Sequence, residues 1–166
     1  MVKERRIFRY VLSDAWENMI SQVDIIENLN GGNVRCLYYE PYTIYNREAN
    51  TEADFFTTAI SSESISRIKK AMYSHKDIFS FKKVEDPVVL DGVINTFEFA
   101  LEKELVNIIK AYNIWVFEKA VMDVAFFETP VLPYKGKEVV AVYDEISKIL
   151  LDSGVNEKYL KLNIEI

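Results

Sequence analysis

The sequence predicts one α+β domain in which an antiparallel sheet is packed on one side by two or three helices. Two observations favour this fold class: strand-like alternation of apolar and polar residues recurs in both halves of the chain, and a long apolar stripe at helical spacing lies near the C-terminus. Only 5 Gly and 4 Pro occur among 166 residues, which argues against disorder and against a turn-dense barrel. We therefore expect residues 1–166 to form a single domain.

The first element is predicted to be a strand over Ile7–Leu12, where alternate residues are apolar. Asp14 and Glu17 then resemble a capping box, and apolar residues follow at helical spacing, so we predict a helix over about residues 14–29. The β-branched run Val23–Ile26 and the turn sequence Asn30-Gly31-Gly32 favour a strand–turn–strand hairpin instead. The sequence alone leaves these two alternatives open.

The middle of the chain is predicted to hold two strands and a helix. Val34–Tyr39 has strand composition, and Phe55–Ile60 is a second, shorter strand after a polar loop. Ser61 or Ser62 is placed to cap the helix that follows. The apolar stripe of that helix is Ile65, Ile68 and Met72.

Four further strands are predicted after residue 76, and together they indicate an antiparallel meander. Their ranges are Asp77–Val84, Val93–Leu101, Leu105–Phe117 and Val121–Phe127. In the second of these strands, Phe97, Phe99 and Leu101 share one face and are candidates for the core.

The C-terminus is predicted to carry the main covering helix. It begins at Lys137 or Glu138 and runs to Asp152, with apolar residues at a period of 3.6. Gly154 is placed to end this helix in a left-handed conformation. Leu160–Ile166 alternates, which is typical of a half-buried strand or a partly ordered tail.

Composition and charge restrict the compartment and the partners. Cys36 is the one cysteine, so no intrachain disulfide can form, and the charged N-terminus Met1–Arg9 is unlike a secretory signal. We therefore expect a cytoplasmic protein. The longest apolar runs are too short to span a bilayer, and the net charge of −6 disfavours nucleic acid, so we expect neither membrane nor nucleic-acid binding. A basic protein is the partner that this charge suits.

Most catalytic and metal chemistry is missing from the sequence. His75 is the only histidine and falls at a predicted helix end, while Cys36 lies in an apolar strand where a thiol is buried and unreactive. Zinc sites need several His or Cys, and no phosphate-binding glycine motif or calcium-loop spacing occurs. We expect no enzyme, no cofactor and no metal. The 26 acidic residues still offer chance carboxylate pairs, so an unrecognised hydrolase remains an alternative.

A cluster of tyrosines around Pro41 is the strongest candidate for a partner surface. Tyrosine combines a large rigid ring with a polar tip, which suits recognition, and an acidic loop follows the cluster. The alternative is an ordinary amphipathic strand with one face buried. The predicted partner-binding residues are Tyr38, Tyr39, Tyr42, Tyr45, Glu48, Glu52 and Asp54.

The second half of the chain resembles small uncharacterised bacterial proteins, some of which act as immunity proteins for secreted toxins. The resemblance rests on Val89-Leu90-Asp91-Gly92, Phe97-Glu98-Phe99, Tyr112-Asn113-Ile114-Trp115 and the helix Tyr143–Gly154. The chain departs from that pattern after Trp115, where Val116-Phe117 replaces an expected proline. The resemblance implies an α+β fold.

The sequence thus predicts a non-enzymatic protein-binding module. The leading case is an immunity-type protein that neutralises a basic toxin domain. The alternatives are a binder of a small molecule or peptide with an aromatic pocket, and the unrecognised hydrolase. An enclosed cavity lined by tyrosines would favour the first alternative, and converging carboxylates in a cleft would favour the second.

Overall fold

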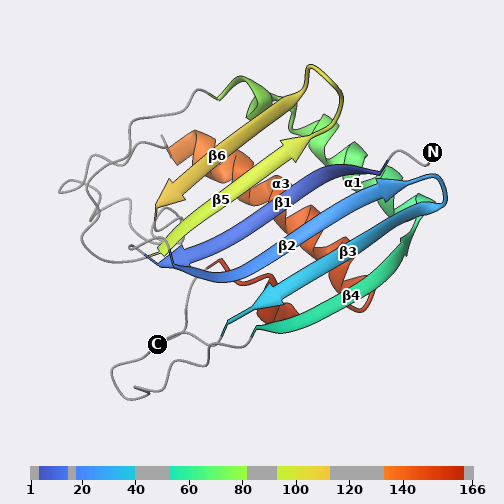
Figure 1. The fold of residues 1–166 in the computed structure, drawn as a ribbon. Coiled ribbons are helices and arrows are strands. Elements are labelled where there is room, and N and C mark those ends of the chain that lie inside the picture. The colour runs from blue at the N-terminus through green and yellow to red at the C-terminus, as the bar shows by residue number, and fades with distance from the viewer. Residues whose placement is uncertain (1–3, 15–17, 40–52, 82–92, 113–132, 163–166) are drawn as a thin grey trace, which may run out of the picture.

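A computed structural model describes residues 4–14, 18–39, 53–81, 93–112 and 133–162. In this part of the chain, six antiparallel strands form one sheet, and two helices cover one of its faces (Figure 1). The α+β class with the sheet packed on one side by helices is therefore confirmed. The strands are β1 (Arg5–Asp14), β2 (Met19–Asn28), β3 (Gly31–Tyr38), β4 (Asp54–Ser61), β5 (Val93–Ala100) and β6 (Val106–Tyr112). The helical elements are α1 (Ser62–Ser74), α3 (Pro133–Asp152) and the 3₁₀ turns η1 (Lys76–Ser80) and η3 (Glu157–Tyr159).

The strand order is β4-β3-β2-β1-β5-β6, so the N-terminal strand lies in the middle of the sheet. Four predicted strands are confirmed, and each observed end lies within three residues of the predicted one. They are Ile7–Leu12, Val34–Tyr39, Phe55–Ile60 and Val93–Leu101. The strand predicted from Leu105 forms β6 as far as Tyr112. Its remainder, and the strand predicted over residues 121–127, lie outside the described residues.

The helix predicted over residues 14–29 is wrong, and the hairpin alternative is correct. Val23 and Ile25 are buried on the helix-covered face, while Asp24 between them pairs with Arg9 on the other face. That two-residue period fits a strand, and the β-branched side chains favour it. Asp14 is the last residue of β1 and accepts hydrogen bonds from the backbone and side-chain nitrogens of Asn18, at 2.8 and 2.9 Å.

The hairpin turn requires a glycine. Gly31 has φ of +133°, a conformation that side-chain-bearing residues rarely adopt. A Cβ atom at this position would also lie 2.4 Å from the carbonyl oxygen of Ile60. The close approach of the β2–β3 turn to the end of β4 therefore depends on the absence of a side chain.

The strand predicted over Asp77–Val84 is also wrong in its described part, because Lys76–Ser80 forms the 3₁₀ turn η1. Only Ile78 is buried there, and the hydroxyl of Ser80 donates to the carbonyl of Asp77 at 2.7 Å. The side-chain amide of Asn107 in β6 donates to the carbonyls of Ile78 and Phe81. These bonds satisfy the backbone without a sheet partner. Residues 82–84 lie outside the described part of the chain.

Both predicted helices are present. Ser61 caps α1 through its hydroxyl, which accepts from the Ser64 backbone nitrogen at 3.0 Å. Helix α3 begins a few residues earlier than predicted and ends at Asp152. Gly154 follows with φ of +91°, which confirms the expected left-handed residue. Residues 160–162 form no strand, and residues 163–166 lie outside the described part.

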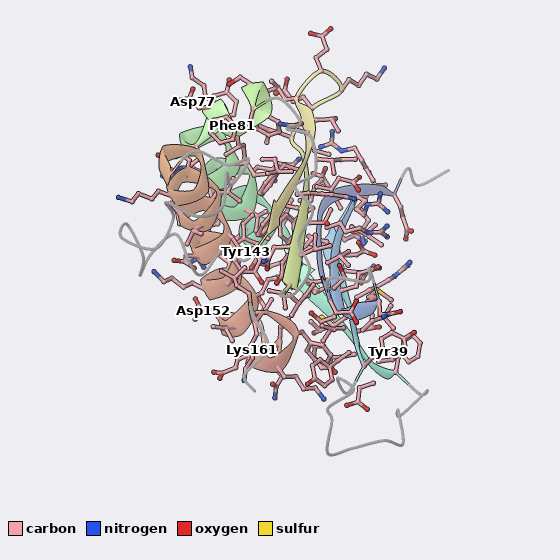
Figure 2. All side chains as sticks on the ribbon, turned by 90° about the vertical axis from the view of Figure 1, so that its left-hand side faces the viewer. Tyr39, Asp77, Phe81, Tyr143, Asp152 and Lys161 are labelled. Carbon is pink, nitrogen blue, oxygen red and sulfur yellow. The ribbon has the colours of Figure 1, made fainter. Side chains whose placement is uncertain are left out.

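Aromatic side chains fill the core between the sheet and the helices. The rings of Tyr10 in β1 and Tyr143 in α3 lie 4.8 Å apart, and Figure 2 shows Tyr143 between α3 and the sheet. The Tyr143 hydroxyl donates to the carbonyl of Leu160, and the Tyr10 hydroxyl lies 2.6 Å from the carbonyl oxygen of Lys161. Burial raises the pKa of both phenols. These bonds fix the chain after η3 against the core. No helix among the described residues is long and apolar enough to cross a membrane.

Candidate functional site

Three of the seven predicted partner-binding residues are described, and all three lie at one end of the sheet. Tyr38 ends β3, Asp54 begins β4, and the register places these two residues opposite each other. Tyr39 follows, its backbone nitrogen donating to the carbonyl of Ile20. Figure 2 shows Tyr39 at the opposite end of the molecule from Asp77 and Phe81. Tyr42, Tyr45, Glu48 and Glu52 lie outside the described residues.

A lysine from the C-terminal 3₁₀ turn meets this end of the sheet. The ammonium of Lys158 lies 2.6 Å from a carboxylate oxygen of Asp54. It also lies 5.3 Å from the ring centre of Tyr38 and 5.1 Å from that of Tyr159, within range of cation–π attraction. The hydrogen bond to Asp54 raises the pKa of Lys158. We call these four residues the tyrosine–aspartate site.

The aromatic rings of the site are held in place by the core. Tyr159 is buried, its ring stacks on Phe56 at 6.1 Å, and it meets the Tyr38 ring edge-on at 6.4 Å. Tyr38 and Tyr39 are each half-buried. The rings of Tyr38 and Phe56 therefore pack against Tyr159 and form an aromatic platform beside the lysine.

The charged groups above the platform are accessible to a partner. The side chain of Asp54 is 66% exposed and that of Lys158 is 37% exposed. Ion pairs at such exposure contribute about 0–1 kcal/mol, so a competing cation could replace Lys158 at small cost. Chemically, this carboxylate and these two rings can hold an ammonium or guanidinium group, and in the folded chain Lys158 supplies that group.

The sequence could not reveal two members of this site. Lys158 and Tyr159 follow Tyr38 and Asp54 by more than a hundred residues, and no spacing rule links them. One signal was available. The predicted C-terminal helix, which Gly154 ends, carries the chain back across the sheet.

The face of the sheet opposite the helices carries charges that satisfy one another. The guanidinium of Arg9 donates to both oxygens of Asp24, at 2.6 and 2.9 Å, and Gln22 donates to the same carboxylate. The guanidinium of Arg6 contacts both oxygens of Glu98, at 2.8 and 3.1 Å. These charged side chains on the described part of the face are therefore paired with one another, while the Nε of Arg6 is buried without a hydrogen-bond partner.

His75 lies where the sequence predicts, at the end of the first helix, and it joins the two helices. Its Nδ1 lies 3.0 Å from a carboxylate oxygen of Glu138, and its Nε2 lies 3.1 Å from one of Glu145. The two glutamates are seven residues apart on α3 and therefore share a face. The bond to Glu138, more than any other contact, raises the pKa of His75. With both nitrogens engaged, the ring acts as a clamp between α1 and α3.

The described part of the chain holds one free cysteine and no cluster of side chains that could bind a metal ion. Cys36 is buried, and burial raises the pKa of its thiol to about 12, so the reactive thiolate is not populated at neutral pH. No cluster of three or more metal-ligating side chains occurs among the described residues. The expectation that Cys36 is buried is confirmed.

A shallow depression of about 410 Å³ lies beside the C-terminal half of α1. Tyr73 is the one tyrosine in its lining and is 60% exposed, so the depression is not an enclosed aromatic cavity. It is also remote from Tyr38, which does not line it. The lining residues are Lys69, Lys70, Tyr73, Ser74, Leu101 and Glu102.

Comparison of the chain with protein-family models and with curated proteins finds no match. The geometry described above is therefore the basis for a functional proposal, and the resemblance to immunity-type proteins stays a prediction.

Proposed function

We propose that this chain is a non-enzymatic protein-binding module whose partner is a basic protein, with the toxin-neutralising role of an immunity protein as the leading case. The observation that carries the proposal is the tyrosine–aspartate site, where Asp54 and the faces of Tyr38 and Tyr159 surround a cation. A lysine or arginine of the partner takes the place of Lys158, making the same carboxylate and ring contacts.

The distribution of charge supports a basic partner. The described residues contain 15 Lys and Arg and 15 Asp and Glu, so the whole net charge of −6 belongs to the rest of the sequence. A net negative charge accelerates the encounter with a basic partner.

The proposal is tested with the domain encoded beside this gene. An immunity-type role requires a neighbouring gene for a secreted protein with a basic C-terminal domain, and that domain should bind this chain in a calorimetric titration. Asp54→Asn should weaken the binding about tenfold or more, equivalent to about 1.4 kcal/mol, because the partner's cation loses its carboxylate.

Lys158 provides a test of opposite sign. Lys158→Ala should strengthen binding, because it empties the place that the partner's cation occupies. Lys148→Ala removes the same charge from the exposed side of α3 and serves as the matched control. Equal effects of the two lysine variants would show that only net charge matters, and the site assignment would then be wrong. Absence of any binding to the neighbouring domain would refute the toxin-neutralising role.

A further inference from the structure

Strand β4 forms one edge of the sheet and lacks the features that usually protect an edge. Among the described residues, only β3 pairs with it. It is eight residues long, its register with β3 shows no bulge, and it contains neither Lys nor Pro. Natural edge strands are normally blunted by such charges, prolines or bulges, because their unpaired backbone groups otherwise attract another strand. The opposite edge strand, β6, does carry a lysine, Lys110.

The side chains of β4 that face away from the helices are exposed. Phe55 is 79% exposed and is the most exposed aromatic side chain among the described residues, and Thr57 and Ala59 beside it are also exposed. In order along the strand, this face therefore presents a large, a medium and a small side chain. Asp54 is the only charged residue of the strand and lies at its end.

We infer that β4 pairs antiparallel with β4 of a second copy of this chain, about a two-fold axis that passes through Thr57 perpendicular to the sheet. This axis keeps the helix-covered faces of both copies on the same side, so a single sheet continues through both molecules. An isologous contact of this kind is the commonest way in which identical chains associate.

The Thr57-centred register is favoured by the side chains that it brings together. Thr57 meets the second copy's Thr57, a cross-strand pair that can share a hydrogen bond, and the large Phe55 lies over the small Ala59 of the second copy. The two Asp54 carboxylates are then six residue steps apart, about 20 Å, so they repel little. A slip by one residue would place the exposed row of one copy opposite the helix-facing row of the other, which the pleat forbids.

The pairing does not depend on the proposed function, since it is argued from the backbone edge of β4 and from Phe55, Thr57 and Ala59, none of which belongs to the tyrosine–aspartate site. Wild-type protein should sediment as a dimer at tens of micromolar in analytical ultracentrifugation. Thr57→Lys places a charge in the middle of the pairing edge and should give a monomer with an unchanged circular dichroism spectrum. Ile108→Lys, at an exposed position on the opposite edge strand, is the control and should stay dimeric.

Cysteine cross-linking tests the register. Under mild oxidation Thr57→Cys should form an intermolecular disulfide, because the two Cα atoms face each other across the axis. Ala59→Cys should not, since the two positions are four residue steps apart, about 13 Å, beyond disulfide reach. The native Cys36 is buried and leaves both results clear. A monomeric wild type, a dimer that survives Thr57→Lys, or efficient cross-linking through Ala59→Cys would each overturn the inference.

Discussion

Replacing His75 by glutamine should lower stability more at pH 6 than at pH 9. The imidazole lies between Glu138 and Glu145, at 3.0 and 3.1 Å, and at the C-terminal end of α1, where the helix dipole also favours a cation. The folded protein therefore binds the His75 proton more tightly than the unfolded chain, and the pKa is raised. The stabilisation is fully present below the unfolded pKa of about 6.5 and is lost as the pH rises through the raised folded value.

The expected size is modest because the cluster is partly solvated. The His75 side chain is 19% exposed, and that of Glu145 is 51% exposed. Two screened contacts of this kind contribute on the order of 1 kcal/mol in total, which for a chain of this length corresponds to about 2–4 °C in Tm. Thermal unfolding of wild type and His75→Gln at pH 6 and pH 9 measures the difference directly.

Controls separate the clamp from other effects of charge. The double variant Glu138→Gln, Glu145→Gln should show the same loss of pH dependence, because it removes both negative charges that stabilise the imidazolium. Lys76→Gln removes a positive charge from an exposed neighbouring position and should leave the pH dependence as in wild type. A His75→Gln destabilisation that is equal at both pH values would refute the reasoning. Folded His75→Gln and folded His75→Ala should both bind the partner as the wild type does.

Three further variants test the packing. Cys36→Ser should lower the free energy of unfolding in urea by about 1–3 kcal/mol, because it buries a hydroxyl in an apolar strand. Partner binding by the folded variant should stay intact, and loss of binding without loss of fold would contradict the expectation that Cys36 has no functional role. Gly31→Ala should destabilise the protein by about 2 kcal/mol or more, because the added methyl group collides with the Ile60 carbonyl and the φ of residue 31 is strained for alanine. A neutral result in thermal unfolding would show that this turn can relax. Gly154→Ala should cost only about 1 kcal/mol, because no atom lies within 4 Å of the added Cβ and the φ of +91° is the sole penalty; a cost as large as that of Gly31→Ala would refute this ranking.

The elements that the sequence predicts correctly are those with a local cause. Ser61 caps α1 with its own hydroxyl, and Gly154 ends α3 through its own backbone freedom, so neither depends on distant residues. The two errors arise where a tertiary partner decides. Residues 19–28 have apolar positions compatible with both periods, and pairing with β1 and β3 selects the strand. Residues 76–80 alternate like a strand, but they form a 3₁₀ turn in which Asn107 of β6 donates to the carbonyls of Ile78 and Phe81.

In the candidate site too, the residues with a local signal are predicted and those that depend on tertiary structure are missed. Tyrosine content and neighbouring acidic residues mark Tyr38, Tyr39 and Asp54 from the sequence, because composition is a local property. The cation that Asp54 binds comes from Lys158, and only the folded chain brings the two together. Sequence reasoning therefore finds Tyr38 and Asp54 and misses Lys158, the cation that lies beside them.

The central position of β1 has a consequence for how the chain folds. Strands β1 to β4 are joined in sequence order and pair with neighbours along the chain, whereas the contact of β1 with β5 joins Phe8 to Phe99. Closing so long a loop costs conformational entropy before any contact of β5 is gained. The β1–β4 meander is therefore expected to form early, and docking of the β5–β6 hairpin onto the free side of β1 to limit the rate. Until that step, the unpaired side of β1 is an open edge with Phe8, Tyr10 and Leu12 beside it, so the half-formed sheet is the species most prone to aggregate.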